Sequence, residues 1–253
     1  MEETPAGDST GQEMKFYRNE RIEEIAEQRL REFEGKLGSA LSLPIDIELY
    51  GDLVLGLSML WENIDELPGE EVLAGVRPAD RLIVMNERRK LEMEQQAGRR
   101  RLTQGHEMGH WDLFVDISKL DHPELFAGSA PSMFAYRSST GGQVQIMRTL
   151  LLCEAGRDIV RQINARADTP DEARSVNRYA AAILMARAII VEEARKIDCT
   201  QWRNLYRMAE RFGVSISALR VRLEQFNLVY VDQENKKLYA SREEAMGQAR
   251  LQF

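Results

Sequence analysis

The sequence predicts an α+β protein that is mostly helical with a small β-sheet and ends in a helix-turn-helix-like or winged-helix-like C-terminal region. Three observations support this fold class. Apolar residues recur at helical spacing from residue 19 onward, in a first helix that we expect to serve packing alone. Two β-rich runs, 71–77 and 81–86, flank a proline-containing turn. A Phe-Gly-Val-Ser turn at 212–215 joins two helical patterns, and two short strand-like runs follow.

The composition fits a globular protein. Of the 253 residues, 43% are hydrophobic and 30% are charged. The 41 acidic residues outnumber the 34 Lys and Arg residues, and the net charge of −7 argues against general nucleic-acid binding. The two cysteines, Cys153 and Cys199, show no metal or redox spacing, which favours a reducing cytoplasm. No apolar run is long enough to cross a bilayer, and no secretory signal precedes the first charges.

One short stretch carries the strongest chemical signal. It reads His-Glu-Met-Gly-His from His106 to His110. Residues four apart lie on one face of a helix, so the two histidines can bind one metal ion, and two neutral imidazoles favour zinc. Glu107 lies beside the open coordination position, where it can act as a general base on water. These features predict a zinc centre with Glu107 as its catalytic residue.

The alternative is a helix with two surface histidines, and the context argues against it. The chain has three histidines, and two of them fall in this motif. Leu102, Met108 and Gly109 suit a solvated face poorly. An apolar run follows at once, made of Trp111, Leu113, Phe114, Val115 and Ile117. We therefore expect the motif to lie in a core.

The residues around the motif resemble the ImmA/IrrE family of zinc metallopeptidases. Members show an Arg-rich lead into His-Glu-hydrophobic-Gly-His-Trp, matched here by residues 100–111. A downstream family helix containing Ala-Asn-x-Phe-Ala-x-x-Leu-Leu-Met-Pro is matched by residues 176–185, with Ala186 where proline is usual. Residues 212–215 match the family's Phe-Gly-Val-Ser turn. The likeness covers about residues 20–230.

The resemblance implies a cytoplasmic, zinc-dependent endopeptidase. Such proteases often cleave a helix-turn-helix transcriptional repressor in one loop and so derepress mobile-element or stress-response genes. The protein substrate would then be the partner, with no membrane and no nucleic acid involved. The alternative is a DNA- or protein-binding transcriptional regulator whose metal site is structural or vestigial. We expect a disordered tail at 1–14, a zinc metallopeptidase domain at 15–198 and the helix-turn-helix-like region at 199–253. The sequence leaves the oligomeric state open.

The third metal ligand departs from the family pattern. The family has a glutamate four residues before the Asn, and that position is Ala173 here. The neighbouring Glu172 is our predicted third ligand, because it continues one helical face. That face also holds Val176, Tyr179 and Ile183. A capping role in the first helical turn explains Glu172 as well. Glu154, on a helix expected at 143–165, and His122, in a loop expected at 116–137, are the other candidates.

Smaller expectations concern local structure. Residues 44–49 alternate and predict a short strand. The 71–86 hairpin is either a substrate-binding edge or an ordinary structural hairpin. The run Arg99–Arg101 indicates a solvated helix face paired with Glu92 and Glu94. We expect Arg220 and Arg222 at exposed positions of the second helix of the helix-turn-helix. They are too few to favour DNA over a packing or protein-docking role.

Overall fold

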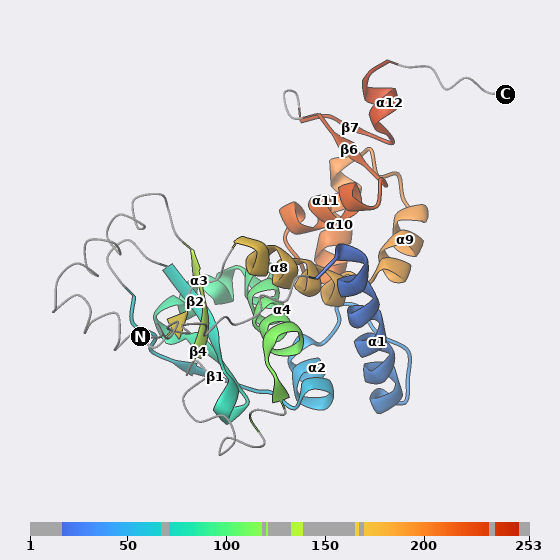
Figure 1. The fold of residues 1–253 in the computed structure, drawn as a ribbon. Helices are drawn as coiled ribbons and strands as arrows, with labels where there is room; N and C mark the ends of the chain where they lie inside the picture. Colours follow the sequence, from blue (N-terminus) through green and yellow to red (C-terminus); the bar gives the residue numbers. More distant parts are fainter. Residues whose placement is uncertain are drawn as a thin grey trace, which may run out of the picture.

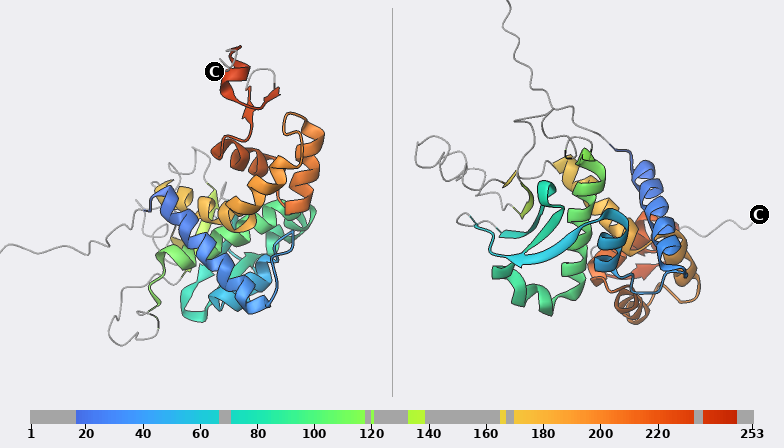
Figure 2. Two further views of the ribbon diagram at one scale, coloured as in Figure 1. Left: turned by 90° about the vertical axis from the view of Figure 1, so that its right-hand side faces the viewer. Right: turned by 90° about the horizontal axis from the view of Figure 1, so that it is seen from below.

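The structure is a computed structural model, and it describes residues 17–66, 71–117, 120, 133–138, 165–166, 170–232 and 236–247. The fold is α+β and mostly helical, as predicted. The long helix α4 (Ala97–Phe114) lies between the sheet and the helices α8 (Pro170–Leu184) and α1 (Asn19–Leu37) (Figures 1 and 2). The C-terminal helices and hairpin stack on one end of this body (Figure 1).

Helix α1 forms as the apolar spacing predicts. Its buried apolar side chains recur every three or four residues: Ile22, Ala26, Leu30 and Phe33. The helix ends at Gly38, whose φ of 66° lies in the left-handed region that glycine adopts without strain.

The strand predicted at 44–49 is wrong. The segment instead forms α2 (Ile47–Tyr50), which continues into a π-helical turn, η1 (Gly51–Leu55). The Asp46 side chain caps α2 by accepting a hydrogen bond from the Leu49 amide at 3.0 Å. A capped helix start satisfies backbone donors locally, and this outweighs the weak alternation of apolar residues.

The sheet confirms the predicted hairpin and decides between its two interpretations. The strands are β1 (Ser58–Glu62), β2 (Glu71–Arg77), β3 (Leu82–Asn86), β4 (Met133–Ser138) and β5 (Ala165–Arg166). Their order is β1-β3-β2-β4-β5, with β2 and β3 antiparallel and β1 parallel to β3. Both hairpin strands therefore have neighbours on each side. A peptide cannot be added at either of them, so the hairpin is structural.

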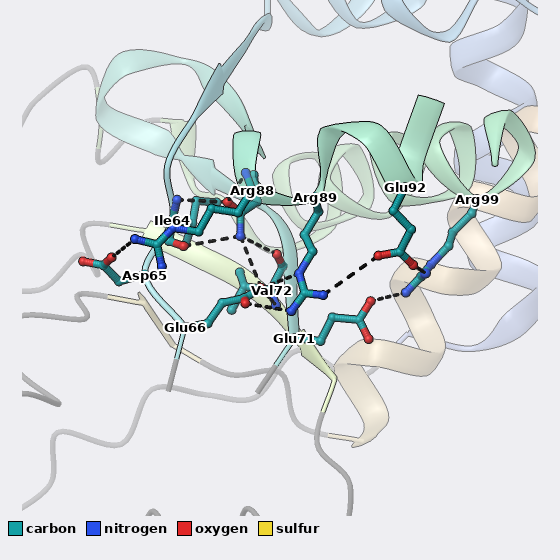
Figure 3. Close-up of polar contacts among 10 residues, drawn as sticks. Ile64, Asp65, Glu66, Glu71, Val72, Arg88, Arg89, Glu92 and Arg99 are labelled. Carbon is teal, nitrogen blue, oxygen red and sulfur yellow. Dashed lines mark hydrogen bonds and ion pairs between the residues drawn. The ribbon is translucent and has the colours of Figure 1, made fainter. Parts of the chain in front are cut away.

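A polar network links the residues that follow β1, up to Glu66, to the start of β2 and to the end of β3 (Figure 3). Asn86 is fully buried and donates to the Val72 and Ile64 carbonyls at 2.8 and 3.3 Å. Glu66 accepts from the Val72 amide at 2.9 Å and from two Arg89 nitrogens at 2.9 and 2.7 Å. Each buried polar atom named here has a partner, so the start of β2 is held firmly against the loop.

Ion pairs join this network to the start of α4. Arg99 contacts Glu92 of α3 (Lys90–Gln95), as predicted, and its second partner is Glu71 of β2, in place of the expected Glu94 (Figure 3). Arg101 donates to the Ile45 carbonyl, so Arg99 and Arg101 are both used in contacts within the fold. The 3-10 turn η3 (Glu87–Arg89) leads from β3 into α3.

A short break separates the helix that carries Glu172 from the next helix. Helix α8 ends at Leu184 and α9 (Arg187–Arg195) begins three residues later, after the extended residue Ala186 (φ −50°, ψ 135°). The break occurs at the position where the resembled family has proline, although this chain has alanine there. The turn is therefore set by packing, because Met185 and Ala186 are both buried.

The helix-turn-helix-like and wing-like predictions are confirmed. Helix α10 (Trp202–Phe212) ends at Gly213, with φ at 63°, and Ser215 Oγ caps α11 (Ile216–Gln225) through the Ala218 amide at 3.1 Å. The strands β6 (Tyr230–Val231) and β7 (Leu238–Tyr239) pair antiparallel, and a short helix, α12 (Arg242–Ala245), follows. One apolar cluster runs from Ile22 in α1 to Leu238 in β7, so this region shares the core of the main body.

One expectation about α11 is wrong. Arg222 is fully buried, because it enters an ion pair with Glu23 of α1. Arg220 is half-buried and lies 3.8 Å from Glu224. The expected tail at 1–14, the helix at 143–165 with Glu154, and His122 lie outside the described residues. None of the helices in the described ranges combines the length and apolar character needed to cross a bilayer.

A buried hydrogen-bond chain ties four helices together. Asp112 of α4 accepts from Arg29 of α1, at 2.5 Å for the shortest contact, and from the Tyr179 hydroxyl of α8 at 2.9 Å. Burial, and then the neighbouring Tyr50 and Asp112, raise the pKa of Tyr179, so its hydroxyl keeps its proton. Since Tyr179 donates to Asp112, Tyr50 of α2 donates to Tyr179, at 2.7 Å. The chain thus runs from the surface on α1 into the core.

Replacing Tyr179 with phenylalanine tests this chain. We expect the free energy of unfolding to fall by about 1–3 kcal/mol, because Asp112 loses a buried donor and Tyr50 loses its acceptor. The matched control is Tyr206→Phe, since Tyr206 is 58% exposed. It should change stability by less than about 0.5 kcal/mol. Denaturant unfolding of both variants measures the difference, and equal losses would refute the role of the chain.

Candidate metal centre

The His-Glu-x-x-His motif lies in the middle of α4 and is fully enclosed. His106 and His110 are each 2% exposed, and Glu107 is 0% exposed. Residues 103–111 are all buried, which is unusual for so polar a stretch and follows from the position of α4 between the sheet and α8. The alternative of two surface histidines is therefore wrong.

The two imidazoles point at one position. Their Nε2 atoms lie 3.2 Å apart. Two nitrogens bound to one tetrahedral zinc ion, each at about 2.0–2.1 Å, are about 3.3–3.4 Å from one another. The separation in this chain is thus already that of a ligand pair. Because residues four apart share a helix face, α4 brings the two side chains to the same side.

The orientation of His106 is set by α8. Its Nδ1 lies 2.9 Å from Oδ1 of Asn177. An amide oxygen only accepts, so Nδ1 carries the proton and donates it, which leaves the Nε2 lone pair directed at the shared position. A second partner of this kind is what a metal-binding histidine usually has. The donor set of the two imidazoles therefore fits a zinc ion.

The sequence analysis assigned no role to Asn177. The available signal was its place in the helix that resembles the family, within the run 176–185. Sequence spacing could not predict the contact between Asn177 and His106, because the two residues are 71 positions apart. Only the packing of α8 on α4 brings them together.

Two glycines make this packing possible. A side-chain carbon built on Gly105 would lie 3.0 Å from Cβ of Ala180, and one built on Gly109 would lie 3.0 Å from Cβ and 3.2 Å from the carbonyl oxygen of Val176. The two contacts run in opposite directions along the chain, so α4 and α8 are antiparallel. Their small residues allow the helix backbones to approach closely enough for Asn177 to reach His106.

Glu172, the predicted third ligand, lies in the first turn of α8. Val176, Tyr179 and Ile183 are fully buried, as the predicted face requires, while Glu172 is half-buried. Gly105 faces Ala180 and Gly109 faces Val176. Continued by one more turn, this antiparallel pairing places Glu172 opposite Leu113, one turn beyond His110 on α4. Within the described part of the chain no three His, Cys, Asp or Glu side chains form a metal-binding group. Glu172 as third ligand stays a prediction.

Comparisons with known proteins add little to this geometry. No family model and no curated protein matches the chain. Among solved structures, a Mycobacterium tuberculosis transcriptional regulator is similar with a TM-score of 0.40 and 12% sequence identity, over 87% of this chain and 50% of that protein. The chain thus spans half the length of that regulator. So distant a similarity fixes neither a family nor an activity.

The glycine contact yields a test. We expect Gly109→Ala to lower the free energy of unfolding by about 1–3 kcal/mol, because the new methyl group overlaps the Val176 backbone and pushes α8 away. Gly35→Ala is the control, since Gly35 lies on α1 with nothing within 4 Å of the added carbon. It should raise stability by about 0.5–1 kcal/mol. Thermal unfolding distinguishes the two, and a neutral Gly109→Ala would contradict the close approach.

The third ligand has its own test. We expect Glu172→Ala to lower zinc affinity much more than Glu154→Ala, because three protein ligands normally hold a catalytic zinc ion. Bound zinc is measured after dialysis against a weak chelator. Zinc lost only from the Glu154 variant would reverse the assignment, and zinc kept by both variants would point to His122 or another group.

Proposed function

We propose that the chain is a zinc-dependent endopeptidase of the His-Glu-x-x-His type. The observation that carries the proposal is the convergence of two buried imidazoles, with Nε2 atoms 3.2 Å apart and the His106 tautomer set by Asn177. The Asn177 contact leaves Nε2 of His106 without a proton, so this nitrogen has a lone pair directed toward Nε2 of His110. The resemblance of residues 100–111 and 176–185 to ImmA/IrrE metallopeptidases supports the same conclusion.

The residues of α4 divide the chemistry between them. His106 and His110 would hold the metal through their Nε2 atoms. Zinc bound there would polarise the scissile carbonyl and make a water molecule more acidic. Glu107, the next residue along the helix, takes a proton from the attacking water and later passes it to the leaving amine. Its complete burial places this proton transfer in a poorly solvated site.

The proposed substrate is a protein, in the form of a helix-turn-helix transcriptional repressor cleaved in one loop. This substrate class follows from the resemblance to ImmA/IrrE proteins. Cleavage would derepress mobile-element or stress-response genes.

Recognition of duplex DNA by α11 forms no part of the proposal. The exposed positions of α11 are Ser217, Val221 and Gln225, none of which is charged. Phosphate contacts supply most of the affinity of DNA-binding helices, and they need cations at such positions. Arg222 of α11 is fully buried and points into the core, so it is not placed to contact a phosphate.

The deciding experiment compares Glu107→Gln with His106→Ala. Co-expression with the repressor encoded beside the gene for this chain, followed by detection of a cleaved band, measures activity. Glu107→Gln should keep the metal and the fold but lower cleavage by roughly 10²–10⁴-fold, because the amide cannot accept the proton. His106→Ala should lose the metal as well.

Metal content, measured alongside cleavage, separates the two variants. Wild-type cleavage by Glu107→Gln at matched metal content would refute the general-base role. Full metal content in His106→Ala and in His110→Ala would show that the ion binds elsewhere. Zinc bound at the histidine pair without cleavage of any co-expressed repressor would favour a regulator with a structural metal site.

A further inference from the structure

Arg222 is firmly anchored although it lies on the helix where the sequence predicted an exposed cation. Its Nη1 and Nη2 donate to the two carboxylate oxygens of Glu23 on α1, at 2.5 and 2.7 Å. Its Nε donates to the carbonyl of Met185, where α8 breaks, at 3.1 Å. The guanidinium also lies over the ring of Phe226, 4.5 Å from the centroid. A buried, forked pair of this kind fixes the relative position of α11 and α1.

Glu23 is shared by two arginines. Its Oε1 also accepts from Nε of Arg178 on α8, at 2.9 Å. Burial on its own favours a higher pKa for Glu23, but the hydrogen bond and charge of Arg222, and then those of Arg178, outweigh it and hold the pKa below its usual value. One ionised carboxylate on α1 therefore connects α11 to the middle of α8.

Arg178 is the residue next to Asn177, which orients His106. The same helix is held at its end, where Arg222 binds the Met185 carbonyl. Because Gly109 leaves no slack between α4 and the Val176 backbone, a shift of α8 moves the Asn177 amide relative to His106. The contacts form a continuous path from α11 to the metal centre.

The C-terminal region also touches α4 directly. A side-chain carbon on Gly98, in the first turn of α4, would lie 2.6 Å from the Ser215 amide nitrogen and 2.7 Å from the Val214 carbonyl carbon. A carbon on Gly213 would lie 2.9 Å from Nε of Arg101. The turn between α10 and α11 thus rests on the helix that carries both histidines.

We propose that Glu23 and Arg222 are positioning residues of the metal centre. They hold α8 in the position in which the Asn177 side chain accepts the hydrogen bond from His106. The helix-turn-helix-like region is therefore part of the scaffold of the site. This inference rests on the proposed metal centre at His106 and His110. It assigns the region a task that neither DNA reading nor substrate docking requires.

Cobalt(II) binding to the full chain tests the proposal. The dissociation constant comes from titration, and the visible absorption spectrum reports the ligand geometry. Arg222→Met keeps most of the side-chain volume but removes the fork, and we expect roughly tenfold weaker binding with an altered spectrum. Asn177→Ala should weaken binding to a similar extent. The double variant should bind no more weakly than Asn177→Ala alone, because Arg222 acts through Asn177.

Glu193→Gln is the matched control. Glu193 is 9% exposed and pairs with the exposed cations Arg211 of α10 at 2.7 Å and Lys196 at 2.9 Å, so its replacement removes the ion pairs of a buried carboxylate in the same region away from α8. This variant should lose stability and keep wild-type cobalt affinity and spectrum. If Arg222→Met does not fold, Glu23→Gln has the shape of the native residue and completes the same cycle.

The outcomes separate this inference from the proposed function. Unchanged affinity in Arg222→Met, or losses that add in the double variant, would overturn the positioning role while the metal centre stands. Equal weakening in Glu193→Gln would also overturn it, because general destabilisation would then explain the effect. Wild-type cobalt binding that survives His106→Ala would overturn the metal centre and the positioning role together.

Discussion

The close approach of α4 and α8 is the constraint on which the site depends. Gly105 and Gly109 have no side chain on the face that meets Ala180 and Val176, so the two backbones come nearly into contact. At this separation two polar cross-links form between the helices, from His106 to Asn177 and from Asp112 to Tyr179. A larger residue at either glycine would lengthen both. Gly105 and Gly109 are thus as necessary to the geometry as the histidines.

Helix α1 supports both partners of this helix pair. Its Arg29 binds Asp112 of α4, and its Glu23 binds Arg178 of α8. The expectation that this helix serves packing alone is therefore too narrow. Buried carboxylates are costly unless they are paired, and both of those named here have arginine partners. The polar groups behind the histidine pair consequently form a satisfied network instead of a strained one.

The helix-turn-helix-like shape of the C-terminal region does not by itself indicate a DNA-binding surface. Its second helix turns Arg222 inward and exposes uncharged positions. Its turn packs on the first turn of α4. The same arrangement of two short helices is a compact way to cover one end of a helical core. Charge and burial, more than the shape, decide what such a unit can bind.

The sequence alone determined the elements whose signals are local. The spacing of His106 and His110, the apolar stripe of α1, the 71–86 hairpin and the Ser215 cap all depend on residues within a few positions of one another. One local signal gave a wrong prediction. The alternation at 44–49 predicted a strand, but the Asp46 cap starts a helix there.

The tertiary structure alone decided the contacts between residues far apart in the chain. Asn177 lies 71 residues from His106, and Glu23 lies 199 residues from Arg222. The periodicity of the sequence does not show such pairs, because they depend on how four helices pack once their apolar faces are buried. The burial of Arg222 has the same origin. Its partner, Glu23, lies on α1, whereas the sequence of α11 alone indicates only that an arginine there can be exposed.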